Sequence, residues 1–228
     1  MALARNRPVT RAGDNRTAPD RRETPMERRY RLVLEIDSAS LEVLRRAHMR
    51  VALAKGSATT RPSVAWLAWT PSENDTVTWN ENYGIYAALG PVEAGTAIRL
   101  QAAVYPAAHQ MNYVFLEDRF GTPAPQPTIP PGHIEIRNGS SSPQTMGLLQ
   151  AANRNGEVTR APLDAIVVPR GLSADFTVAN TAYVWLGRDV TSGTIATVPA
   201  DATALTFSRD ARTKRCVYDC KAEHFRET

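Results

Sequence analysis

Hydrophobic and polar residues alternate in the first clearly patterned segment of this 228-residue chain. RYRLVLEI (residues 29–36) carries apolar side chains at every second position from Tyr30 onward, which is typical of a half-buried β-strand. DSASLEVLRRA then predicts a short helix near residues 38–47, and HMRVALA predicts a second strand over residues 48–54. Three polar residues can accept the free N–H groups at the start of the helix: Asp37, Ser38 and Ser40.

The rest of the chain consists of short apolar runs separated by turn residues. Pro, Gly, Asn, Asp and Ser occupy almost every gap between runs such as TAIRLQAAVY, DAIVV and AYVWL. Many strands at short spacing, without long helical patterns, indicate antiparallel sheets rather than alternating strands and helices. The predicted fold is therefore all-β: an antiparallel β-sandwich, jelly-roll-like or Greek key, with one short N-terminal helix.

A single sandwich domain over residues 30–228 is the predicted organisation, because all-β sandwiches often contain about 200 residues. The segment GTPAPQPTIPPG, residues 121–132, has five prolines. It predicts an extended loop that crosses from one sheet to the other. The alternative is that this segment divides two domains of about 90 residues each.

Three of the four tryptophans lie between residues 66 and 79. Residues 71–75 form a turn sequence, which predicts a hairpin whose two strands place Trp66 opposite Trp79. Both rings are buried in this register, and Trp69, beside the loop, is exposed. A slip of one residue would reverse these assignments.

An exposed indole beside amide side chains suits a sugar ring or a lipid headgroup, because it offers a flat apolar face and hydrogen-bonding groups. The predicted ligand-binding residues are Trp69, Asn80, Asn82 and Tyr83. The alternative is that Trp69 fills the second face of a sandwich or a subunit contact, since large aromatic side chains are usually buried.

Positive charge is concentrated at the N-terminal end of the chain. Residues 1–29 contain eight arginines and four acidic residues, a net charge of 8 − 4 = +4, and the remaining 19 basic and 19 acidic residues cancel. This segment has almost no bulky apolar side chains to offset the entropy of ordering it. It is predicted to be a disordered basic tail.

A basic tail suits electrostatic contact with the phosphates of a nucleic acid. An Arg-rich arm before an all-β body resembles, in architecture and without a shared motif, the coat proteins of small RNA viruses. The resemblance implies a structural protein whose arm contacts nucleic acid. The arm residues assigned to this contact are Arg5, Arg7, Arg11, Arg16, Arg21 and Arg22.

The sequence shows neither a transmembrane segment nor an export signal. Its longest apolar runs, such as AIVV at residues 165–168, are far shorter than the roughly 18 residues that a membrane-spanning helix requires. The N-terminal tail lacks the apolar core of a secretory signal. The expected location is cytoplasmic, with export by a non-classical route left open.

No phosphate-binding glycine loop, GxSxG nucleophile turn or HExxH zinc motif occurs in the sequence, so no catalytic residue and no cofactor is predicted. Cys216, Cys220 and His224 are spaced four apart. Zinc requires a fourth ligand, however, and structural zinc sites usually show paired cysteine motifs. The C-terminal segment is therefore predicted to be frayed, with two unpaired thiols and no metal.

Together these features favour a non-enzymatic recognition or self-assembly protein. It is expected to form homo-oligomers and to contact its ligand, a carbohydrate or a lipid headgroup, through aromatic and Asn-rich loops. A coat-type protein is the second hypothesis, and a hydrolytic enzyme whose site is not visible in the sequence is the third.

Overall fold

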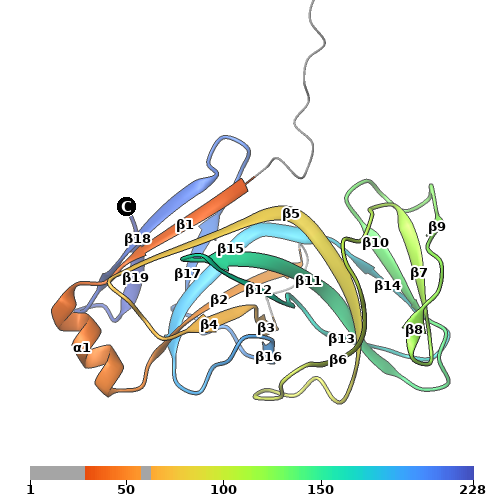
Figure 1. Cartoon of the computed structure of the whole chain (residues 1–228), viewed down its shortest axis with the longest axis horizontal. Coiled ribbons are helices and arrows are strands. Elements are labelled where there is room, and N and C mark those ends of the chain that lie inside the picture. Colours follow the sequence, from red (N-terminus) through yellow and green to blue (C-terminus); the bar gives the residue numbers. More distant parts are fainter. Residues whose placement is uncertain (1–28, 58–62) are drawn as a thin grey trace, which may run out of the picture.

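The computed structural model describes residues 29–57 and 63–228, and most of its regular structure is β-strand. Figure 1 shows several sheets and a short helix, so the predicted all-β fold is confirmed. The six candidate arginines of the basic tail lie outside the described residues. Arg29, assigned to the tail, is instead the first residue of a strand. No helix in the described part of the chain is long and apolar enough to cross a membrane.

The largest sheet has eight strands in the order β12-β11-β5-β1-β18-β19, with β13 beside β11 and β6 beside β5. Its strands are β1 (Arg29–Glu35), β5 (Asn74–Leu89), β6 (Arg99–Val104), β11 (Gln144–Arg154), β12 (Glu157–Pro162), β13 (Ile166–Val168), β18 (Thr213–Asp219) and β19 (His224–Glu227). Most neighbours are antiparallel, but β1 and β18 are parallel. The 16-residue strand β5 pairs with β1 along its first half and with β11 along most of its length. It therefore lies in the middle of this sheet.

Three smaller sheets complete the molecule. The four-stranded sheet, in the order β17-β15-β2-β4, contains β2 (Arg50–Ser57), β4 (Leu67–Trp69), β15 (Val178–Gly187) and β17 (Thr203–Thr206). The five-stranded sheet contains β7 (Met111–Leu116), β8 (Arg119–Phe120), β9 (Ala124–Pro125), β10 (Ile134–Asn138) and β14 (Ser173–Phe176), with β7 and β10 parallel. The two-stranded sheet pairs β3 (Val64–Ala65) with β16 (Thr194–Ile195).

The N-terminal part of the chain folds as its pattern predicts. Tyr30, Leu32 and Leu34 on β1 are buried, with exposed or half-buried residues between them. Helix α1 (Ser38–Arg46) begins where the Asp37 carboxylate accepts the Ser40 N–H at 3.0 Å. The helix joins β1 of the eight-stranded sheet to β2 of the four-stranded sheet, and Figure 1 places it at the opposite end of the molecule from the five-stranded sheet.

The predicted tryptophan hairpin is wrong, although its central contact exists. Strand β4 pairs with β2, and β5 pairs with β1 and β11, so residues 70–73 carry the chain from one sheet to another. Trp66 and Trp79 meet edge to face across the two sheets, with ring centroids 5.7 Å apart. Pairing of Trp69 with Val51 places its ring inside as well, and it is 5% exposed. The expected exposure of Trp69 is therefore wrong.

Two further predictions about connections also change. The proline-rich segment 121–132 follows β8 and precedes β10, which belong to the same sheet, so it does not cross between sheets. The C-terminal segment is not frayed, because β18 and β19 form a paired hairpin in which Phe225 is 1% exposed. Both cysteines are free, with Cys216 buried and Cys220 exposed. Burial raises the pKa of the Cys216 thiol to about 12.

Candidate ligand-binding sites

The hairpin formed by β11 and β12 separates two cavities. Its two-residue loop is Asn155-Gly156, and both residues have positive φ, 49° and 98°, as a type I′ turn requires. In the ladder, Asn153 lies opposite Val158 and Arg154 lies opposite Glu157. Successive pairs in a sheet point to opposite faces. Each face of the hairpin therefore presents its own set of side chains.

One cavity, which we call the outer pocket, has a volume of about 230 Å³ and lies on the Asn153 side of the hairpin. Its polar wall consists of Arg29, Thr78, Asn80, Asn82, Tyr105 and Asn153. The three polar wall residues from β5 have even numbers, whereas the odd-numbered Val77, Trp79 and Tyr83 are buried, and of these Trp79 also lines the pocket. Strand alternation thus brings the two predicted amides, Asn80 and Asn82, to the same face.

Most of the polar groups around the outer pocket are already engaged. Arg29 donates to the Thr78 hydroxyl at 3.0 Å, and the Asn153 side chain accepts the Gly156 N–H at 2.8 Å. The Arg160 guanidinium lies 3.9 Å from the centre of the Tyr105 ring and holds that ring as one wall. By contrast, the half-buried amides of Asn80 and Asn82 make no hydrogen bond within residues 29–57 and 63–228.

A buried lysine lies behind the outer pocket. Lys55 is 4% exposed, and its ammonium group donates to the Gln150 Oε1 at 3.0 Å. Gln150 in turn donates to the backbone oxygen of Asn80 at 2.5 Å. Burial lowers the pKa of the Lys55 side chain to about 7, and the Glu81 carboxylate opposes part of this change.

Three aromatic rings surround the Lys55 nitrogen, which is 5.4 to 5.5 Å from the ring centres of Trp66, Trp79 and Tyr83. Their negative faces replace part of the hydration that the amine loses on burial. Tyr83 was predicted from the sequence to bind a ligand. It is only 8% exposed, and its ring instead forms part of the cage around Lys55. Burial raises the pKa of its hydroxyl, which stays protonated at neutral pH.

The second cavity, which we call the edge cleft, has a volume of about 320 Å³. It lies where β4, the last strand of its sheet, approaches β12, the last strand of the largest sheet. Its wall includes Arg50, Trp69, Arg154, Glu157, Thr159 and Ser192. Trp69 therefore lines a cavity, but a different one from Asn80 and Asn82.

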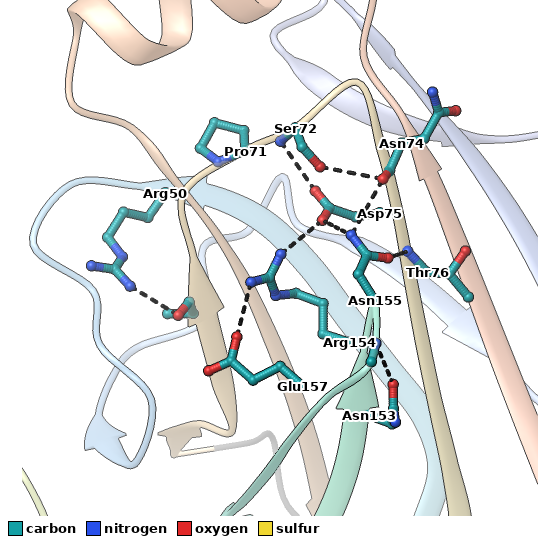
Figure 2. A network of polar contacts seen from close by, with 12 residues as sticks. Arg50, Pro71, Ser72, Asn74, Asp75, Thr76, Asn153, Arg154, Asn155 and Glu157 are labelled. Carbon is teal, nitrogen blue, oxygen red and sulfur yellow. Dashed lines mark hydrogen bonds and ion pairs between the residues drawn. The ribbon is translucent and has the colours of Figure 1, made fainter.

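A buried carboxylate fixes one wall of the edge cleft (Figure 2). The Asp75 side chain, 1% exposed, accepts from the Arg154 guanidinium at 3.1 Å and from the Asn155 amide at 3.0 Å. Arg154 also pairs with Glu157 at 3.3 Å, and its guanidinium carbon lies 5.8 Å from the Trp69 ring centre. These contacts hold the cation of Arg154 in place and compensate its charge with two carboxylates.

Arg50 and Trp69 each contribute an N–H group without an acceptor. Figure 2 shows the Arg50 guanidinium turned toward a backbone oxygen, which is that of Ala68 at 2.9 Å. The Arg50 Nε and the Trp69 Nε1 are both buried and have no hydrogen-bond partner among the described residues. Buried N–H groups are nearly always paired, so these two donors distinguish the wall of the edge cleft from the rest of the described core.

The residues that build these sites were mostly missed at the sequence level. Lys55 and Gln150 are 95 positions apart, and Asp75 and Arg154 are 79 apart, so no local pattern joins them. The Asn155-Gly156 pair is a strong hairpin signal and would have located the hairpin between the cavities. Among residues 29–57 and 63–228, no group of three or more His, Cys, Asp or Glu side chains is arranged to hold a metal ion.

Comparison with known proteins adds no relative. No family model matches the chain, and neither a curated protein nor a solved structure matches it.

Proposed function

We propose that this protein is a non-enzymatic recognition protein whose outer pocket binds a neutral sugar ring. The observation that carries this proposal is the pair of amides from Asn80 and Asn82, which face one cavity without internal partners. An amide offers both a donor and an acceptor. Two amides at alternate positions of a strand lie about 7 Å apart and can hydrogen-bond different hydroxyl groups of one sugar.

The surroundings of the two amides support a neutral ligand. The Tyr105 wall is fixed by Arg160, and Arg29 is held by Thr78, so the pocket is shaped before a ligand arrives. Small-molecule sites combine such fixed walls with a few polar groups that set orientation. The hydroxyl groups of a neutral sugar ring both donate and accept hydrogen bonds, as the two amides do.

Saturation-transfer NMR with neutral hexoses and N-acetylhexosamines tests the proposal. At least one sugar should bind the wild-type protein, and Asn80→Ala and Asn82→Ala should each abolish or strongly weaken the signal. Asn180→Ala, which removes an exposed amide on β15, is the matched control. Because substitutions at such surface sites change stability by only about 0.5 kcal/mol, thermal melts should be unchanged. Equal binding by all variants, or binding to phosphatidylcholine vesicles and to no sugar, would contradict the proposal.

A further inference from the structure

The edge cleft is lined by two residues that each have a buried N–H group without an acceptor in the described part of the chain. Trp69 is 95% buried, since only 5% of its surface is exposed, and its indole N–H has no acceptor in the described part of the chain. The Arg50 Nε is likewise buried and has no acceptor among the described residues, and both residues line the edge cleft. Two buried donors at one cavity call for an acceptor that arrives from outside.

Charge compensation separates the two arginines of the cleft. Arg154 is paired with Asp75 and Glu157, so its charge is already balanced. Arg50, in contrast, has no carboxylate within ion-pair distance in residues 29–57 and 63–228, and its guanidinium contacts the neutral oxygen of Ala68. One half-buried cation in the cleft is therefore free to receive an anion.

The edge of β4 is closed to another strand. The Ala68 N–H donates to the Ser192 hydroxyl at 2.8 Å, and the Ala68 oxygen accepts from Arg50 at 2.9 Å. The N–H and the oxygen of Ala68, with which a docking strand would pair, therefore already have hydrogen-bond partners. The cleft is therefore not a peptide-augmentation site, and its volume of about 320 Å³ falls in the usual range of small-molecule sites, roughly 300–1,000 Å³.

From these features we propose that the edge cleft binds the oxyanion of a small ligand: a carboxylate, a sulfate or a phosphate. Arg50 supplies the charge and one N–H group, and Trp69 supplies a second N–H group from the core side. Hydrogen bonds from a guanidinium to such oxygens are charge-assisted and directional. Arg154, fixed by Asp75, shapes the opposite wall. This site is separate from the outer pocket, which lies on the other face of the β11–β12 hairpin.

Isothermal titration calorimetry with the sodium salts of sulfate, phosphate, acetate and glucuronate, at one ionic strength held with sodium chloride, tests the proposal. At least one salt should give saturable binding at one site per chain, and the four arms distinguish an inorganic anion from a carboxylated ligand. Constant ionic strength removes the contribution of general screening.

Two variants then locate the site. Trp69→Phe keeps an aromatic ring but removes the N–H group, and it should weaken binding about tenfold or more. Arg50→Gln should abolish binding. The matched controls are Trp185→Phe, a buried indole outside both cavities, and Arg209→Gln, an exposed arginine. Both controls should bind as the wild type does.

Near-UV circular dichroism checks that each variant keeps its fold, and if Trp69→Phe does not fold, Arg50→Gln alone decides. No saturable binding by any of the four salts would overturn the proposal. Unchanged binding by Arg50→Gln, or equal losses in Arg50→Gln and Arg209→Gln, would overturn it too.

Discussion

A buried charge lies behind each of the two cavities, but the two charges are stabilised in different ways. Behind the edge cleft, Asp75 is met by the cation of Arg154 and by the Asn155 amide. Lys55, which lies on the core side of β5 behind the outer pocket, has an amide oxygen and three aromatic rings. Dipoles and rings offset only part of the desolvation of a buried amine, so burial lowers the pKa of Lys55 to about 7.

The different partners of Asp75 and Lys55 also determine which polar groups each cavity presents. The ion pair at Asp75 fixes a guanidinium beside Trp69 and leaves the donors of Arg50 and Trp69 as the unsatisfied groups of the cleft. The Lys55 amine uses its contacts within the core, so the outer pocket presents neutral amides. The edge cleft thus has an arginine paired with two carboxylates, and the outer pocket, on the opposite side of the hairpin, has two unpaired amides beside Arg29.

The largest predicted effect comes from breaking the ion pair. Asp75→Ala leaves the Arg154 guanidinium, whose side chain is 28% exposed, without its buried partner. It should lower the free energy of unfolding by about 3–5 kcal/mol, as measured by denaturant melts. Glu157→Ala removes the exposed partner of the same arginine and should cost about 0.5 kcal/mol or less. Similar losses in the two variants would show that the buried pair has no special role.

A smaller effect concerns the lysine and pH. The pKa of Lys55 is about 7 in the fold and near its ordinary value of 10.5 in the unfolded chain, so the unfolded chain binds more protons between these values. Stability should therefore rise with pH, by about 1.5–2 kcal/mol from pH 7 to 8.5. Over this range the caged Tyr83 hydroxyl stays protonated, because burial raises its pKa.

The control for this pH dependence is Lys55→Met, which removes the titrating amine and keeps a side chain of similar length. Denaturant melts of the variant should show a flatter dependence between pH 7 and 8.5. An unchanged slope in Lys55→Met would mean that another group titrates in this range.

The smallest stability effect concerns the loop that joins the two faces. The Asn155 side chain accepts the Thr76 N–H at 2.8 Å and donates to Asp75 at 3.0 Å. Asn155→Gly keeps the positive φ of the turn but loses both contacts, so it should cost about 1–2 kcal/mol in denaturant melts. Asn155→Ala should cost more, because alanine does not favour this backbone conformation. A larger loss in the glycine variant would contradict this account.

Sequence reasoning found what alternation along one strand determines. The buried positions of β1, helix α1 and the shared face of Asn80 and Asn82 all follow from the spacing of apolar residues within one segment. The position of Trp69 cannot be predicted from spacing in this way, because the position depends on whether β4 pairs with β5 or with β2. Both pairings bury apolar residues, and the turn at residues 71–75 is compatible with either.

The polar groups of the edge cleft could not be predicted from local sequence patterns either, because they meet only in the folded protein. Arg50, Asp75 and Arg154 come from three separate strands, and each alone is an ordinary surface residue in sequence. Only the packing of two sheets buries Asp75 and leaves the donors of Arg50 and Trp69 without partners. Lys55, similarly, is a polar residue in an apolar run of β2. The rings of its cage come from β5 and from Trp66, just before β4.

The most direct test of the contrast between the two cavities is an NMR titration of the wild-type protein with sodium sulfate and with sodium acetate at constant ionic strength. The Trp69 indole N–H resonance, assigned by its loss in Trp69→Phe, should move downfield and saturate with at least one anion as its proton gains an acceptor. The side-chain amide resonances of Asn80 and Asn82 should stay in place. So should the indole resonance of Trp66, which already donates to the backbone oxygen of Gln150 at 3.1 Å. A Trp69 resonance that does not move, or amide resonances of Asn80 and Asn82 that move with it, would contradict the account.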